Sequence, residues 1–156
     1  MKFKFLPHTA DVKFQAWGKT IEEVFENSAN ALFASLTNKK VKLKKKMSIR
    51  AEGNDLEGLM YNFLEEFLFL LDSENFIPGK IEEVKLDREN FKIVAKASGD
   101  DANSKENDYE ISHIKAITYS EMEITHLPDR WVAQVVLDVW YLKQNNFWIN
   151  INNTPK

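Results

Sequence analysis

The stretch Trp131-Val-Ala-Gln-Val-Val-Leu-Asp-Val-Trp-Tyr-Leu142 is the strongest fold signal in the chain. Its odd-numbered positions are almost wholly apolar and its even-numbered positions are mixed, which is typical of a central strand with one buried and one partly buried face. Asp138 interrupts this strand. An ionised carboxylate in such a place is costly unless a cation or several hydrogen-bond donors meet it. We therefore expect Asp138 to be either paired in the core or a ligand.

Length and composition limit the number of domains and the classes of function that the chain can have. The 156 residues contain no long Pro/Gly/Ser linker, so we expect a single domain with one core. The formal charge of −3 gives no global reason to expect nucleic-acid binding. With no cysteine, the chain has no disulfide, thiolate metal site or cysteine nucleophile. The sequence shows neither a secretory signal nor a membrane span, which predicts a cytoplasmic or nuclear protein.

Two helices are predicted from caps and periodicity. Thr20-Ile-Glu-Glu23 has the pattern of a capping box, and apolar residues recur at helical spacing from there to Leu36. Asn54-Asp55 offers an N-cap for a second helix that continues to Leu71. The second apolar stripe is wide, so we expect this helix to be covered on more than one side.

The other apolar runs predict short strands. Residues 81–86 and 91–97 flank a polar turn and predict a hairpin, after a break at residues 75–79. The acidic residues 98–110 have no periodicity and predict a mobile loop. Further strands are expected near residues 2–6, 12–16, up to 51, 111–119 and 122–124. The pattern favours an α+β fold: a single domain with a mixed, mostly antiparallel sheet and the two main helices packed on one face.

Residues 37–46 form a basic connection with six lysines. Such a run can attract phosphate or an acidic partner. The alternative is a solvated loop that leads into a strand edge, where lysines discourage mispairing. The sequence favours the solvated loop, because no aromatic or arginine residue is interleaved as in single-strand binders.

Three polar residues interrupt strand faces or strand ends: Asp11, Lys115 and Asp138. If the two carboxylates converge, they suit Ca²⁺ or Mg²⁺/Mn²⁺ together with main-chain oxygens and water. The same three groups could form a buried ion network without a metal, and spacing alone favours that network. His8 lies three residues from Asp11 and could join it, although lone histidines are more often structural. The strand at residues 111–119 places His113 and Lys115 on one face with Ile117.

Several segments together resemble the archease family. They are His8-Thr-Ala-Asp-Val12, residues 16–27, Lys115-Ala-Ile-Thr-Tyr119 and Val135-Val-Leu-Asp-Val139. The resemblance runs in order from Phe3 to Val139, and the wording Phe76-Ile-Pro78 is closer to eukaryotic members. It implies an archease-like domain at residues 1–139. Residues 140–156 would then be a C-terminal extension that continues the last strand and ends in a tail.

The resemblance implies an accessory protein rather than an enzyme. Archeases support the guanylylating RNA ligase of the RtcB kind, which is the catalytic subunit of the tRNA-splicing ligase. They promote formation of the ligase–guanylate intermediate and allow multiple turnover. Some were also proposed as chaperones of a tRNA methyltransferase, so tRNA and that enzyme are further candidate partners.

The resemblance also implies site residues. The family's metal-binding aspartates correspond to Asp11 and Asp138, and Val139 would add a main-chain oxygen. The functional lysine corresponds to Lys115, with His8 and His113 as candidate supporting residues. With these correspondences, a functional acidic site is favoured over an ion network that binds no metal. Because the chain continues past Val139, this residue can offer only a carbonyl and not a terminal carboxylate.

Two other classes of function stay open at the level of sequence. A metal-dependent phosphohydrolase could use Asp11 and Asp138, although no phosphate loop or nucleophile–base pair accompanies them. An RNA-binding module could act through residues 39–46.

Overall fold

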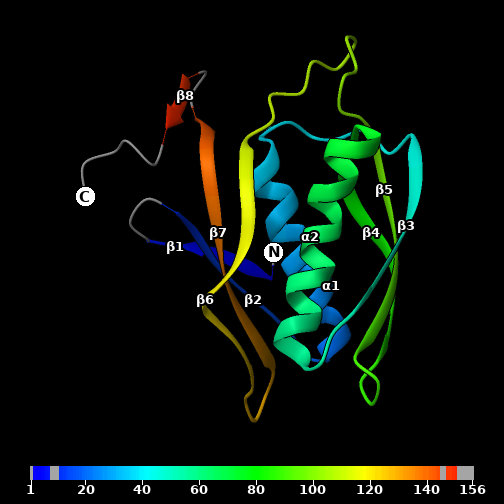
Figure 1. Cartoon of the computed structure of the whole chain (residues 1–156), viewed down its shortest axis with the longest axis vertical. Helices are drawn as coiled ribbons and strands as arrows, with labels where there is room; N and C mark the ends of the chain where they lie inside the picture. The colour runs from blue at the N-terminus through cyan, green and yellow to red at the C-terminus, as the bar shows by residue number, and fades with distance from the viewer. Residues whose placement is uncertain (1, 8–10, 145–146, 151–156) are drawn as a thin grey trace.

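The computed structural model describes residues 2–7, 11–144 and 147–150 (Figure 1). Its elements are β1 (Phe3–Leu6), β2 (Val12–Gly18), α1 (Ile21–Leu36), β3 (Lys45–Glu52), α2 (Leu56–Glu74), β4 (Phe76–Asp87), β5 (Lys92–Asp101), β6 (His113–His126), β7 (Trp131–Gln144) and β8 (Phe147–Asn150). None of the helices in these ranges is long and apolar enough to cross a membrane.

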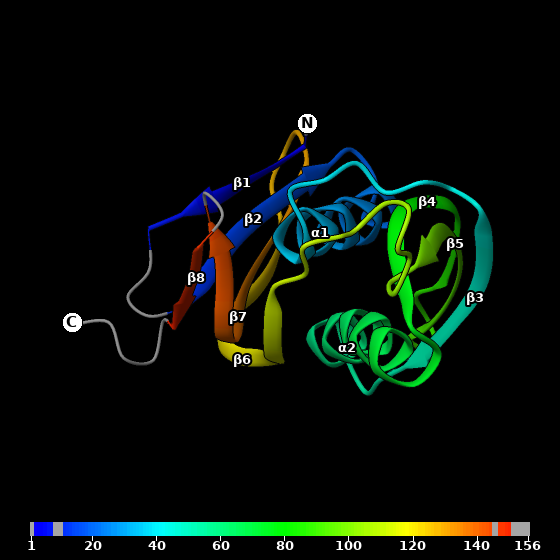
Figure 2. The same ribbon diagram turned by 90° about the horizontal axis from the view of Figure 1, so that it is seen from above.

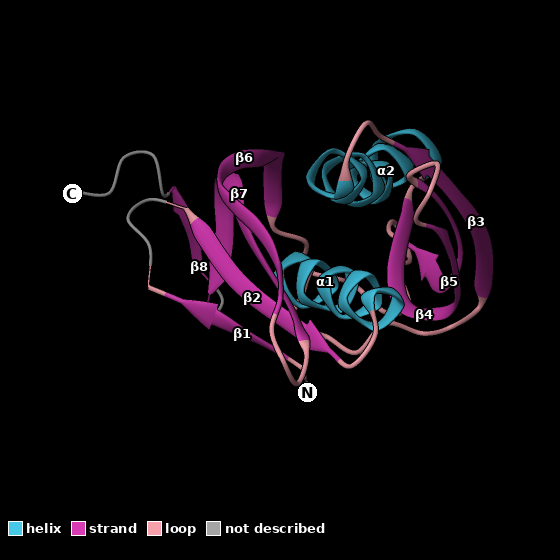
Figure 3. Cartoon of the chain, turned by 90° about the horizontal axis from the view of Figure 1, so that it is seen from below, coloured by secondary structure: helices cyan, strands magenta, loops and turns pink. Residues whose placement is uncertain are grey.

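The α+β class with two helices and antiparallel strands is confirmed, but the strands form two sheets rather than one. The larger sheet has the order β1-β2-β7-β6, with β8 paired to β7, and the smaller has the order β3-β5-β4. Both helices lie between the sheets, as Figures 2 and 3 show. Each helix contacts strands of both sheets. The physical reason is the width of the apolar stripes, because a helix that is apolar on two sides needs cover on both.

Both predicted helix starts are confirmed. The amide of Glu23 donates to the Thr20 hydroxyl at 3.1 Å, and the amide of Gly58 donates to the Asp55 carboxylate at 2.7 Å. The Glu23 carboxylate in turn accepts from the amide of Lys19 at 2.7 Å. These caps satisfy amides that the helices cannot bond internally.

The central hairpin is longer than predicted at both ends. The predicted break at residues 75–79 is correct at Asn75, which ends α2 with a left-handed φ of 52°, but β4 already begins at Phe76, so residues 76–79 lie inside a strand. Pro78 is tolerated because β4 is an edge strand with a register shift between Pro78 and Lys80. β5 continues to Asp101, so a mobile loop over residues 98–110 is wrong for its first part.

The two strands predicted at residues 111–119 and 122–124 form one strand, β6. Its pairing with β7 is interrupted between Thr118 and Glu123, where extra residues are accommodated. Glu121 takes a left-handed φ of 54° in this irregularity. The alternation of apolar and polar residues is interrupted between residues 119 and 122. In the structure this interruption is a bulge within one strand and not a turn between two strands.

β7 runs past Val139 to Gln144, and β8 pairs with it antiparallel from Tyr141↔Asn150 to Gln144↔Phe147. The strand therefore continues into the predicted extension at 140–156. Residues 151–156 and residues 8–10, which include His8, lie outside the described ranges.

Candidate functional site at one end of the larger sheet

The predicted alternation of β7 sets the position of Asp138. Ala133, Val135, Leu137 and Val139 are fully buried against the helices. Asp138 lies on the opposite, outer face, where its side chain is 32% exposed. The expectation that this carboxylate could be paired in the core is therefore wrong. It is paired at the surface.

Lys115 reaches Asp138 because of a bulge in β6. Ile114 pairs with Val139 and Ala116 pairs with Asp138, so Lys115 is the extra residue between them. Such a bulge re-aims a side chain, and it removes Lys115 from the face it was predicted to share with buried Ile117. The Lys115 ammonium lies 3.8 Å from Asp138 Oδ2.

Trp140 completes this arrangement. It follows Asp138 by two residues on the same face of β7, and its ring centroid lies 4.2 Å from the Lys115 ammonium. Sequence reasoning missed Trp140 as a partner of Lys115, although its spacing from Asp138 carried the signal. The lysine is 46% exposed, so both contacts are solvent-accessible and individually weak.

Asp11 approaches from the neighbouring strand. Val12 pairs with Leu137 at the end of the β2–β7 ladder. Asp11 lies in a bend directly before β2, one residue beyond the end of this ladder. The backbone therefore brings Lys115 next to Asp138, and it places Asp11 at the end of β2 that adjoins the same part of β7.

The other predicted site residues are less central. Val139 has a fully buried side chain and pairs with Ile114, so its side chain cannot contribute to a site on the outer face. His113 is exposed at the start of β6, opposite Tyr141. His8 is outside the described residues.

The donor set is compatible with a hard divalent cation. Asp138 in β7 and Asp11, directly before the neighbouring strand β2, would supply carboxylate oxygens, and main-chain oxygens and water complete such sites. Within the described ranges no group of three or more His, Cys, Asp or Glu side chains is placed to hold a metal. A cation at this site would therefore depend on two carboxylates and share Asp138 with the Lys115 ammonium.

Polar pairs continue along the outer face of the same sheet. Lys13 lies 3.4 Å from the Glu121 carboxylate, and the Gln15 amide donates to Gln134 at 3.0 Å. The Gln134 amide donates to the carbonyl of Glu121 at 2.9 Å. These contacts bind the β6 bulge to β2 and β7, which supports the sheet beside Lys115 and Asp138. The i, i+2 spacing of Asp11, Lys13 and Gln15 was a signal for a shared polar face.

Comparisons with known proteins agree on one family. Residues 3–139 match the model of the Archease protein family (MTH1598/TM1083). The chain is 38% identical to the archease of Methanosarcina barkeri over 141 residues, covering 88% of this chain and 96% of that protein. It is 41% identical to the archease of Pyrococcus furiosus over 136 residues, covering 85% and 94%. A fish archease, from Ictalurus punctatus, is 38% identical over 125 residues, covering 79% and 76%.

Two solved structures share the fold. The solution structure of Methanobacterium thermoautotrophicum protein 1598 has a TM-score of 0.75 and 33% identity, covering 88% of this chain and 99% of that one. The crystal structure of an archease from Thermotoga maritima, titled a possible chaperone, has a TM-score of 0.60 and covers 87% and 96%. Its identity is 21%, so that likeness concerns the fold alone.

Proposed function

The chain belongs to the archease family, and from this premise we propose that it is an accessory protein that activates a guanylylating RNA ligase. Activation here means promoting the ligase–guanylate intermediate and allowing multiple turnover, with no chemistry performed by this chain itself. The observation that carries the proposal is the arrangement of Lys115 and Asp138, 3.8 Å apart on the outer side of the larger sheet, with Asp11 directly before the β2 residue that pairs with Leu137.

Charge and position support this role. A ligase that accepts a guanylate must gather a metal ion and the phosphates of a nucleotide. An exposed ammonium can contact a phosphate oxygen, and two adjacent carboxylates can contact a metal ion. Groups held on a rigid sheet end can orient either partner within another protein's active site, and orientation is a large part of catalysis.

A bound metal would be held by Asp11, Asp138 and the main-chain oxygen of Val139. Ca²⁺ or Mg²⁺/Mn²⁺ would suit these oxygen donors and would supply positive charge against phosphate oxygens. Lys115 then acts as the second cation of the site. Its contact with Trp140 restrains the long side chain near the sheet end.

Multiple-turnover RNA ligation tests the proposal. The cognate ligase is assayed alone, with the wild-type protein, and with the Asp138→Ala variant. We expect stimulation by the wild type and its loss in the variant. The control is Asp129→Ala, which removes an exposed carboxylate from the β6–β7 turn. Equal stimulation by wild type and Asp138→Ala would move the mechanism away from this site.

A second candidate is a chaperone for an RNA-processing enzyme such as a tRNA methyltransferase. The description of the Thermotoga maritima archease as a possible chaperone favours keeping it. Protection of that enzyme against thermal aggregation, without any effect on ligation, would select this alternative. GTP turnover by the purified protein alone would instead favour the phosphohydrolase alternative.

A further inference from the structure

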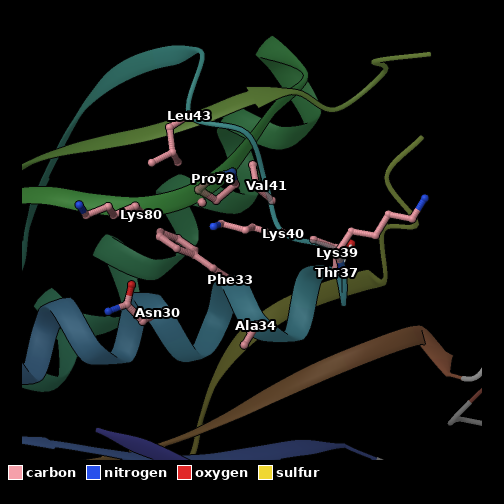
Figure 4. A pocket seen from close by; sticks show the side chains of 11 residues that line it. Asn30, Phe33, Ala34, Thr37, Lys39, Lys40, Val41, Leu43, Pro78 and Lys80 are labelled. Carbon is pink, nitrogen blue, oxygen red and sulfur yellow. Dashed lines mark hydrogen bonds between the residues drawn. The ribbon is translucent and has the colours of Figure 1, made fainter. Parts of the chain in front are cut away.

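A groove of about 360 Å³ lies where α1, residues 37–43 and the start of β4 meet (Figure 4). Phe33, Val41, Leu43 and Pro78 give it an apolar lining. Leu43 is 49% exposed, an unusual value for a leucine beside such a lining. The groove is separate from the Lys115–Asp138 pair and shares no residue with it.

The segment that forms the outer wall is held by several contacts. The amide of Lys42 donates to the Tyr109 hydroxyl at 2.9 Å, and the amide of Lys44 donates to the Gly99 carbonyl at 2.8 Å. Gly79 permits a close crossing, because a Cβ there would lie 3.0 Å from both Val41 and Leu43. A wall fixed in this way is preorganised, which lowers the entropic cost of binding.

The lysines of the segment divide into two groups. Lys39 donates to the carbonyl of Asp108 at 2.6 Å, and Lys44 lies 3.5 Å from Glu106. These two lysines hold neighbouring parts of this chain. Lys40 forms no ion pair with any described residue, and Figure 4 shows its side chain directed over the groove while Lys39 points away. Lys80 adds a second cation at the rim, 3.9 Å from Glu82.

We propose that this groove binds an acidic peptide segment of a partner protein through an apolar anchor side chain. The anchor would contact Leu43 and Val41, and acidic side chains beside it would meet Lys40 and Lys80. Residues 37–46 carry six lysines and no acid within a chain of net charge −3, so the attraction is local to this rim.

The lining favours a peptide over RNA. Single-stranded nucleic acids are held by exposed aromatic faces and arginines. The only aromatic residue of the groove, Phe33, is 6% exposed, and the lining contains no arginine. Aliphatic side chains with a lysine rim instead match the apolar centre and polar rim of protein interfaces.

The position of the groove suggests which partner fills it. The amide of Ser112, just before β6, donates to the carbonyl of Leu36 at the end of α1, at 2.7 Å. Figure 1 shows the segment after α1 passing the end of the molecule at which β6 begins. A protein that reaches Lys115 can therefore also reach this segment. The identity of the partner as the RNA ligase rests on the proposed function.

Binding of the purified ligase by biolayer interferometry tests the inference, at low and at physiological salt. We expect Leu43→Asp to weaken binding at least about 10-fold, because it places a charge at the anchor position. Lys40→Met should weaken it roughly 3- to 10-fold and flatten its salt dependence, since one desolvated charge contact is lost. Lys40→Arg and Lys92→Met should stay within about twofold, because the first keeps the charge and the second lies outside the groove.

The outcomes separate the alternatives. Thermal unfolding of each variant establishes that it is folded, which we expect because Leu43 and Lys40 are solvent-accessible. Unchanged ligase binding by both Leu43→Asp and Lys40→Met overturns the inference while the proposed function stands. Loss of affinity for a short single-stranded RNA, with ligase binding intact, also overturns it and assigns the lysines to RNA. No ligase binding by the wild type overturns the proposed function, and this inference with it.

Discussion

Asp100 and Asp138 are both aspartates within strands, β5 and β7, yet their surroundings are opposite. Asp100 is 4% exposed and accepts from the Tyr109 hydroxyl at 2.7 Å, the Asn107 amide at 2.9 Å and the Asp101 amide at 2.8 Å. Asp138 is one-third exposed, and its ion-pair partner among the described residues is the Lys115 ammonium at 3.8 Å. The first carboxylate is satisfied within the fold, whereas the second is accessible to a ligand.

Asp100 therefore has a structural role, whereas Asp138 is a candidate functional residue. A buried carboxylate with three donors stabilises the segment that supplies them, here residues 101–109. That segment also carries the Tyr109 hydroxyl that holds Lys42. A partly exposed carboxylate with a weak ion pair adds little to the free energy of folding, so binding a ligand there would sacrifice little stability.

Asp138→Asn should lower stimulation of the ligase by roughly 10–100-fold, the usual range for losing a group that binds or orients a metal. Its unfolding temperature should change little, because one surface ion pair is lost. Asp100→Asn should lower the unfolding temperature, but it should leave stimulation per folded molecule unchanged. Paired ligation and thermal-unfolding measurements check both variants, and parallel losses in both assays would break the distinction.

Divalent cations should stabilise the wild type and not Asp138→Asn. At a free concentration 100 times the dissociation constant, the free energy of unfolding rises by about 2.7 kcal/mol. Scanning calorimetry with and without Ca²⁺ or Mg²⁺ measures this, with Asp100→Asn as the matched variant that keeps the effect. An equal shift in Asp138→Asn would place the cation elsewhere.

Asp100→Asn should lower the free energy of unfolding by about 1–3 kcal/mol at neutral pH. The new amide group brings donors toward the Tyr109 hydroxyl and Asn107 amide, and it removes the ionic acceptor. Chemical denaturation measures the change. The control is Asp129→Asn in the exposed β6–β7 turn, which should stay within about 0.5 kcal/mol of wild type.

The effect of Asp100 should depend on pH. The hydrogen bond from Tyr109, followed by the Asp101 amide, holds the pKa of the Asp100 carboxyl below its ordinary value, against the opposing effect of burial. Because the folded-state pKa is the lower one, the contribution to stability is fully present above the ordinary carboxyl pKa. It is lost as the pH falls through the folded-state value. Denaturation curves should therefore show wild type and Asp100→Asn converging in acid, and a constant gap would refute this linkage.

The smallest effect concerns the Lys115–Asp138 pair. A double-mutant cycle with Lys115→Ala and Asp138→Ala should give a coupling energy of about 0.2–1 kcal/mol, as for other exposed ion pairs. The measurement is the free energy of unfolding of the four proteins. A coupling of several kcal/mol would make the pair structural, like Asp100, and would weaken the proposed role.

Features that depend on residues close together in the chain could be predicted from the sequence. The caps at Thr20 and Asp55, the alternation of β7 and the position of Asp138 within it are short-range patterns of hydrogen bonding and burial. The ordered motifs between Phe3 and Val139 also sufficed to place the chain in its family.

Which distant residues meet could be learned from the folded structure alone. The β6 bulge at Lys115, the β2–β7 register that ends at Val12 and Leu137, and the burial of Asp100 each depend on strand pairing across distant segments. Two sheets instead of one followed from helices that needed cover on two sides. Register and bulges are set by packing and pairing between strands, and a one-residue slip would move every side chain to the other face. For the same reason Asp100 is buried although the sequence predicts a polar loop there, and Asp138 is partly exposed although its strand is largely apolar.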